Sequence, residues 1–342
     1  MSVQRDVFGQ MASGQPIERF TLRNRHGLSA QVMTFGATLL GVETPDRIGR
    51  FANITLHLDT CQQYLAGHPC LGSTCGRYAN RIARGRFTLD GVEYRLTTNE
   101  GPNHLHGGRV GFDKVLWEAE LLEEPGADGV RLVYTSPDGE EGYPGTLRAS
   151  VTYRLTDENE LQLDYTAQTD KPTVVNLTNH AYWNLAGAGT ALDHELTLYA
   201  DHYLPVDAAL IPLGEVAPVA GTPMDFTSPR TIRSRIAEVA PGYDHCYVLR
   251  PGSQGSLVPC AQVYEPSTGR TMEVWTTEPG VQFYTGNHLD VRCGDRSYCR
   301  HDGFCLECQH FPDSPNHPNF PSTVLRPGQT YWQRTVHRFG VR

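Results

Sequence analysis

The chain has 342 residues, of which 39% are hydrophobic, and a formal net charge of −9 at pH 7. This composition supports a large core, and the negative charge argues against nucleic-acid backbones and anionic membranes as partners. No stretch approaches the roughly 18–20 apolar residues of a membrane span, and the N-terminus lacks the apolar region of a signal peptide, so we expect a cytoplasmic protein.

Strand and turn signals follow one another along the chain. Alternating apolar and polar residues predict hairpins that turn at His26-Gly27, Asp90-Gly91 and residues 157–160, and a closing strand over residues 330–339. Asp-Gly is the sharpest of these signals, because glycine adopts a positive φ without strain in a two-residue turn. The strands expected around the turns are residues 21–24, 29–35, 87–89, 92–96, 149–155 and 161–167.

Helix signals are few and short. Ser228-Pro229 followed by Ile232, Ile236 and Val239 predicts a helix with an N-cap serine and proline in its first turn. Residues 60–66 and 77–83 predict one or two turns each. We find no internal repeat or linker, so the sequence favours an all-β protein, with residues 1–342 as one large antiparallel domain and a few short helices.

Residues 174–184 carry the most informative pattern in the chain. Their apolar and polar side chains alternate, which predicts a long strand with one face on the core. The other face holds amides, a hydroxyl, a phenol and the imidazole of His180, which are groups that bind polyols. We therefore expect this face to hold a sugar, with the neighbouring amides in a supporting role.

Cysteine and histidine spacings give weak signals of other chemistry. The nine cysteines are scattered, and without a secretion signal they indicate reduced thiols. Cys305-Leu-Glu-Cys308 has no second CxxC partner, so a zinc or redox site is not expected there. His104 and His106 would share a face of a strand and could bind a metal ion, but no carboxylate follows until Asp113. Phosphate-loop, HExxH, GxSxG and GxGxxG motifs are absent from the sequence.

Segments spread over residues 15–340 together resemble the aldose 1-epimerases, also called galactose mutarotases. The resemblance rests on many motifs in the expected order, and its departures, such as the Cys- and Arg-rich residues 291–300, are peripheral. The main motifs are Gly76-Arg-Tyr-Ala-Asn80-Arg81, Pro102-Asn-His-Leu-His106-Gly-Gly, Gly111-Phe-Asp-Lys-Val-Leu-Trp-Glu118, Val175-Asn-Leu-Thr-Asn-His180-Ala-Tyr-Trp-Asn184, Tyr243-Asp244-His245, Gly280-Val-Gln282-Phe-Tyr284 and Gly303-Phe-Cys-Leu-Glu307-Cys-Gln309.

The resemblance implies a β-supersandwich with an open sugar cleft, and an enzyme that interconverts the α and β anomers of free aldoses such as galactose and glucose. It implies no cofactor and no metal ion. It also implies that Glu307 is the catalytic base and His180 the catalytic acid. The substrate-binding residues that it implies are Asn80, Arg81, His106, Asp244 and Gln282.

The residues themselves partly support these roles and leave alternatives open. Glu307 lies in a segment too apolar to expose a carboxylate, so it is either functional or paired with an arginine. His180 is either the acid, with a pKa raised by a nearby carboxylate, or a core histidine. Arg81 could also lie on a solvated face beside Arg77, Arg84 and Arg86, which look like surface residues, and Asp244 could be a turn residue. Trp183 is expected in the core.

Two other functions fit the same resemblance. One is an epimerase for hexose 6-phosphates, which would need a cationic pocket that the arginines of residues 77–86 could supply. The other is a non-catalytic sugar-binding module, which should lack Glu307 or His180. The free-sugar reading requires both residues to face one cleft about a sugar ring apart. We expect a monomer with a monosaccharide ligand; the preferred sugar cannot be read from the sequence.

Overall fold

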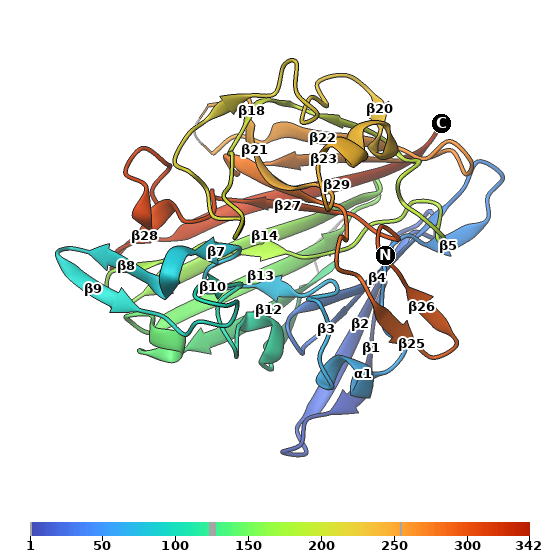
Figure 1. The fold of residues 1–342 in the computed structure, drawn as a ribbon. Helices are drawn as coiled ribbons and strands as arrows, with labels where there is room; N and C mark the ends of the chain where they lie inside the picture. The colour runs from blue at the N-terminus through green and yellow to red at the C-terminus, as the bar shows by residue number, and fades with distance from the viewer. Residues whose placement is uncertain (1, 123–127, 254) are drawn as a thin grey trace.

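The computed structural model describes residues 2–122, 128–253 and 255–342, and strands dominate these ranges (Figure 1). Within them, the largest sheet is antiparallel, with strand order β11-β12-β13-β14-β29-β23-β22-β17-β20. Its strands, in that order, are β11 (Glu118–Leu122), β12 (Gly129–Ser136), β13 (Leu147–Leu155), β14 (Glu160–Thr169), β29 (Tyr331–Val341), β23 (Arg270–Thr276), β22 (Val258–Tyr264), β17 (Glu195–Leu198) and β20 (Arg230–Thr231). β29 therefore joins strands from the middle of the chain to strands near its end.

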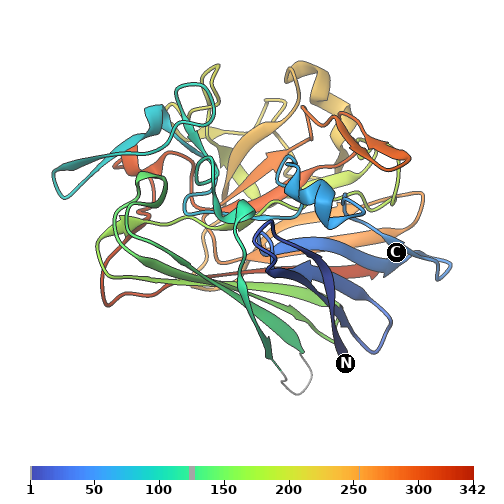
Figure 2. The ribbon, with the colours of Figure 1, turned by 90° about the horizontal axis from the view of Figure 1, so that it is seen from below.

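A second antiparallel sheet comes from the N-terminal part of the chain. It contains, in order, β1 (Ser2–Gln10), β2 (Pro16–Arg23), β3 (Ser29–Met33), β4 (Thr38–Pro45) and β5 (Phe51–Asn53). β2 and β3 contact β13 of the large sheet, and Figure 2 shows these blue strands lying beside the broad green sheet.

A third antiparallel sheet carries much of the candidate site. Its strand order is β19 (Ala217–Pro218), β18 (Ala200–Tyr203), β21 (Asp244–Leu249), β24 (Gly280–Tyr284) and β27 (Cys305–Gln309). The chain segments between the sheets form short strand pairs, which are β6 (Thr74–Cys75) with β16 (Thr178–Asn179), β7 (Arg81–Ile82) with β10 (His104–Leu105), β8 (Arg86–Leu89) with β9 (Val92–Arg95), β15 (Thr173–Val174) with β28 (Val324–Leu325), and β25 (Val291–Cys293) with β26 (Arg296–Tyr298).

The helices are short. They are α1 (Cys61–Leu65) and the 3₁₀ turns η1 (Ala83–Gly85), η2 (Phe112–Lys114), η3 (Glu140–Gly142), η4 (Ile232–Glu238) and η5 (Ser314–Asn316). None of the helices in the described ranges has the length and apolar character to cross a bilayer. The main hydrophobic core lies between the sheets and takes side chains from Phe20 through Phe339.

The all-β prediction is confirmed, and so are the predicted hairpins. The turn at Asp90-Gly91 joins β8 and β9, with both residues at positive φ (50° and 80°). The turns near residues 26–27 and 157–160 join β2 to β3 and β13 to β14, and the closing strand is β29. Residues 60–66 form α1, with Thr60 as its N-cap. All nine cysteines are free.

The prediction of one long strand over residues 174–184 is wrong. The segment is extended but forms only the short strands β15 and β16 and isolated bridges at Asn176 and Trp183. Both of its faces are buried, so the predicted polar face does not meet solvent. Trp183 is in the core, as expected.

Two predicted helices also differ from the structure. Residues 77–82 form no helix, because Arg81 and Ile82 pair with β10 instead, and only Ala83 at the end of the predicted range belongs to the 3₁₀ turn η1. In the region of residues 228–239, the helix is the 3₁₀ turn η4, which starts at Ile232 and has no side-chain cap, so Ser228 and Pro229 precede it. A short 3₁₀ turn buries Ile232 without needing the longer α-helical stripe.

Candidate active site

Three neighbouring strands of the third sheet place three of the predicted site residues together. Gln282 on β24 is paired with Glu307 on β27 and with Cys246 on β21. Asp244 begins β21, two positions before Cys246, so it lies on the same face of the sheet as Gln282 and Glu307. Because side chains alternate along a strand, Asp244, Gln282 and Glu307 form one polar face of this sheet.

Glu307 is buried, with 2% of its surface exposed. Burial and the neighbouring Asp244 carboxylate raise the pKa of Glu307, although Arg81 opposes this shift. Its Oε2 atom has no hydrogen-bond partner among the described residues. A buried carboxylate with an unpaired oxygen is costly to stability, which is typical of a functional group.

His180 enters the same site from the extended segment after β16. Its backbone is fixed on both sides, because its N–H donates to Ser73 O and its carbonyl accepts from Gly72 N. Its ring contacts the rings of His106 and Tyr182, with centroids 5.2 and 5.0 Å away. The main chain and the neighbouring rings therefore hold the imidazole in one place.

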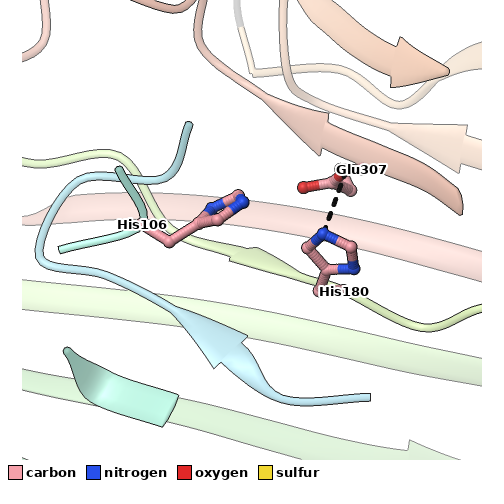
Figure 3. A group of neighbouring side chains, drawn as sticks. All are labelled: His106, His180 and Glu307. Carbon is pink, nitrogen blue, oxygen red and sulfur yellow. Dashed lines mark ion pairs between the residues drawn. The ribbon is translucent and has the colours of Figure 1, made fainter. Parts of the chain in front are cut away.

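His180 and Glu307 face one another, as the sequence analysis required. His180 Nε2 lies 3.7 Å from Glu307 Oε1, and Figure 3 shows both side chains converging with His106 from three separate segments. Burial lowers the pKa of His180 to about 4. The expected upward shift from a nearby carboxylate was therefore wrong, because desolvation of the imidazolium dominates.

His106 stands at the end of β10 in a left-handed conformation, with φ 51°. This turn separates it from His104, which bonds Thr97 O and the Tyr143 hydroxyl instead, so the two histidines do not form a shared metal-binding face. The next residue is Gly107, where any side chain would be excluded because a Cβ would lie 1.7 Å from Gly76 O. The glycine after His106 thus lets this loop lie close to the backbone of Gly76.

Asn80 fixes the protonation of His106. The Asn80 backbone N–H donates to His106 Nδ1 at 3.2 Å, and burial with the nearby His180 lowers the pKa of His106 well below its ordinary value. The neutral ring therefore carries its proton on Nε2. This nitrogen is a hydrogen-bond donor suited to a substrate oxygen.

Arg81, on β7, forms two hydrogen bonds with Glu100, a residue that the sequence analysis did not predict. Its Nε and Nη2 atoms donate to the two carboxylate oxygens of Glu100 at 2.7 and 2.6 Å. Although burial alone would lower the pKa of Arg81, the Glu100 and Asp244 carboxylates raise it. Arg81 is 7% exposed and is not on a solvated face.

These side chains surround a cavity of about 230 Å³. It is lined by six of the seven predicted site residues, Asn80, Arg81, His106, His180, Asp244 and Glu307, and also by Pro69, Cys70, Glu100, Leu105, Tyr182, Tyr284 and His288. The seventh, Gln282, lies behind the wall and donates to Asp244 Oδ1 at 2.6 Å. Gln282, from the Gly-Val-Gln motif, therefore orients Asp244, which lines the cavity.

A larger cavity of about 460 Å³ is lined by Arg84 and Arg86 but by neither Glu307 nor His180. Arg77 is not a surface residue as predicted. It is 2% exposed, and its guanidinium donates to the carbonyl oxygens of Pro144 and Gly145. Arg84 and Arg86 therefore share a cavity that lacks Glu307 and His180, whereas Arg81 lines the smaller cavity and Arg77 is buried.

Among the described residues, His106, His180 and Glu307 form a group whose side chains could hold a metal ion. Each offers a ligand atom within 4.8 Å of the others. However, Asn80 occupies Nδ1 of His106, which leaves a protonated Nε2 rather than a free lone pair. The donor set therefore suits hydrogen bonds to substrate oxygens better than it suits a metal ion.

Comparisons with known proteins show which family the chain belongs to. The family model described as aldose 1-epimerase matches residues 18–338. The chain is 45% identical to galactose mutarotase of Sus scrofa, covering 100% of this chain and 99% of that protein. It is 40% identical to aldose 1-epimerase of Escherichia coli strain K12, covering 95% of this chain and 96% of that protein.

Solved structures are similar over the same length. The galactose 1-epimerase of Lactobacillus acidophilus superposes with a TM-score of 0.89 at 29% identity, covering 100% of this chain and 99% of that one. An aldose epimerase homologue from C. elegans gives a TM-score of 0.88 at 30% identity, covering 94% of this chain and 98% of that one.

Proposed function

The chain belongs to the aldose 1-epimerase family and interconverts the α and β anomers of free aldoses, and we propose that Glu307 and His180 carry out its proton transfers. The observation that carries the proposal is the 3.7 Å approach of His180 Nε2 to Glu307 Oε1 inside a polar cavity.

The reaction requires one base and one acid. A cyclic aldose is a hemiacetal, so it changes anomer by opening, rotating about C1–C2 and closing on the other face. Opening breaks the C1–O5 bond, removes a proton from the C1 hydroxyl and adds a proton to O5. A carboxylate and an imidazole on either side of these oxygens can serve both transfers.

We assign the base to Glu307 and the acid to His180, and each residue transfers a proton of its own. In the reactive form Glu307 is ionised and the His180 ring is protonated. Ring opening delivers the C1 hydroxyl proton to Glu307 and the imidazolium proton to O5, so both groups become neutral. Burial favours this neutral pair, and reclosure runs the same transfers backwards.

The remaining lining residues hold the sugar. His106 Nε2 and the Arg81 guanidinium donate to sugar oxygens and stabilise charge as the ring opens. The Asp244 carboxylate accepts from sugar hydroxyls, and Gln282 fixes its direction. Asn80 lines the same wall and orients His106.

The cavity favours a neutral monosaccharide over a hexose 6-phosphate. Arg81 is the one lysine or arginine among the described lining residues, and it is already paired with Glu100. Glu100, Asp244 and Glu307 would repel a phosphate. We also propose that residues 1–342 act as one domain, as a monomer in the cytoplasm, because one core spans the sheets and the nine cysteines are free thiols.

Polarimetry of freshly dissolved α-D-galactose and α-D-glucose tests this function. The protein should bring both rotations to equilibrium much faster than buffer does. Glu307→Gln and His180→Ala should each lower kcat by roughly 10²–10⁴-fold, because each removes a positioned proton transfer. Glucose 6-phosphate should equilibrate no faster than in buffer.

Glu93→Gln and His202→Ala are matched controls, since both residues are exposed and outside the cavity. They should keep full activity. Equilibration at the buffer rate for every free aldose would contradict the function. Full activity in Glu307→Gln would remove the assigned base even with mutarotation present.

A further inference from the structure

Glu100 makes the closest charged contacts of any residue to the arginine in the cavity wall. Both of its carboxylate oxygens bind Arg81, at 2.7 and 2.6 Å, in the two-point geometry that fixes a guanidinium plane. Its own side chain is 35% exposed, so the pair lies at the mouth of the cavity. Such a pair at a site entrance is a candidate for function rather than for stability.

The backbone below Glu100 is held in place. Asn103 N donates to Glu100 O, and Glu100 N donates to Asn103 O, which closes a tight turn through Gly101 at φ 54°. Asn103 Oδ1 in turn accepts from the backbone N–H of Arg84, three positions after Arg81. The segments that carry the Glu100 carboxylate and the Arg81 guanidinium are therefore hydrogen-bonded to each other through Asn103.

Arg81 has competing partners. Asp244 and Glu307 both act on it electrostatically, besides Glu100. A guanidinium left free among these carboxylates would move towards the most buried of them, because attraction is strongest where solvent is excluded. Close pairing of Arg81 with Glu307 would hold the carboxylate ionised and make it a weaker base.

We propose that Glu100 is a positioning residue that holds Arg81 away from Glu307, so that the arginine binds sugar oxygens while the base stays free to accept a proton. This inference rests on the proposed function. Two guanidinium nitrogens are occupied by Glu100, and the third, Nη1, remains for the substrate.

The charges around the base define the expected pH response. Asp244 lies on the same face of the sheet as Glu307, Arg81 acts on it from β7, His180 lies opposite, and Cys308 follows it on β27 with its side chain on the other face of the sheet. His106 lies beside His180 and Arg81. Removing the Glu100 charge makes these surroundings more positive, so the pKa of Glu307 should fall and the acid limb of the pH profile should move to lower pH.

Glu100→Gln, Glu100→Asp and the control Asp90→Asn test the proposal. Asp90 forms a similar two-point pair with Arg326 on an exposed turn outside the cavity, and asparagine suits its positive φ. kcat and KM for galactose and glucose would be measured from pH 5 to pH 9 with thermal unfolding of each variant.

Glu100→Gln should lower kcat/KM by about 10–100-fold, the effect of losing charge-assisted hydrogen bonds, and should move the acid limb to lower pH with an unchanged melting temperature. Glu100→Asp should recover part of the loss, and Asp90→Asn should match the wild type. Unchanged kcat/KM and pH limbs in Glu100→Gln would overturn the inference while the proposed function stands. A wild type without activity would overturn both.

Discussion

At the scale of single residues, a thiol contacts the ring nitrogen of His180 that does not face Glu307. Cys305 Sγ lies 3.5 Å from His180 Nδ1. Burial and the Glu307 charge raise the pKa of Cys305 well above its ordinary value, so the thiol keeps its proton. The proposed acid is the imidazolium, whose two ring nitrogens both carry a proton, so Nδ1–H can donate to the Cys305 sulfur while Nε2 gives its proton to O5.

Cys305→Ser should therefore retain most activity, and Cys305→Ala should lose about tenfold in kcat, the equivalent of one hydrogen bond of ~1.4 kcal/mol. The serine hydroxyl keeps an acceptor for the Nδ1 proton at this position, and alanine removes it. The measurement is kcat by polarimetry, with melting temperatures to exclude unfolding. Equal losses in both variants would contradict a role in orienting the His180 ring.

Residue by residue, the sequence motifs predicted the cavity wall well, but not what supports it. Six of the predicted residues line the cavity. They could be predicted because each lies in a recognisable motif. Glu100 was missed because its contact with Arg81 comes from the pairing of β7 with β10 and the turn before it, not from a local pattern. His180 was assigned the wrong direction of pKa shift, because burial cannot be read from sequence spacing.

At the scale of elements, the segment of residues 174–184 is fixed by side-chain amides rather than by a strand ladder. Asn176 Nδ2 donates to the carbonyl oxygens of Ala79 and His310, and its Oδ1 accepts from His310 N. Asn176 is fully buried. One amide thus connects the segment that carries His180 to the segments before Asn80 and after Glu307.

Asn176→Ala should lower the free energy of unfolding by about 3 kcal/mol, because it removes three hydrogen bonds, one to the buried Ala79 carbonyl and two to the half-buried backbone of His310. The measurement is urea unfolding of the variant and the wild type. Asn319→Ala is the control, since its amide bonds Gly214 O on an exposed loop and its loss should cost less than about 0.5 kcal/mol. Similar losses in the two variants would contradict the role of Asn176.

At this scale the hairpins could be predicted from the sequence, but the conformation of residues 174–184 could not. The turn at Asp90-Gly91 depends on local backbone chemistry, which the sequence states directly. In residues 174–184 the alternation of residue types is real, but both faces are buried by different neighbours. Alternation predicts a half-buried strand only where one face meets solvent, and the sequence does not reveal that condition.

At the scale of the whole molecule, buried histidines make stability depend on pH. Burial lowers the pKa of His180, His194 and His337 to about 4. The unfolded chain binds protons at these positions below about pH 6.5, and the folded chain does not. Their contribution is therefore complete above pH 6.5 and is lost as the pH falls towards 4. His310, whose pKa Glu278 raises against the effect of burial, acts in the opposite sense.

His337→Phe should become more stable relative to the wild type as the pH falls from 6.5 to 4, by about 2 kcal/mol at pH 5. Phenylalanine keeps the ring contact with Trp183 and removes a group that must be buried uncharged. The measurement is the melting temperature from pH 4 to pH 8. A constant difference across this range would contradict the assignment, and His202→Ala should show the wild-type pH slope.

β29 lies inside the largest sheet, hydrogen-bonded to β14 on one side and to β23 on the other. Because synthesis proceeds from the N-terminus, β14 and β23 are both made before residues 331–341 and must wait for them with open edges. Open edges invite pairing with other chains. From the synthesis of β14, near the middle of the chain, until these residues leave the ribosome, a nascent chain would therefore keep an unpaired strand edge that can pair with other chains.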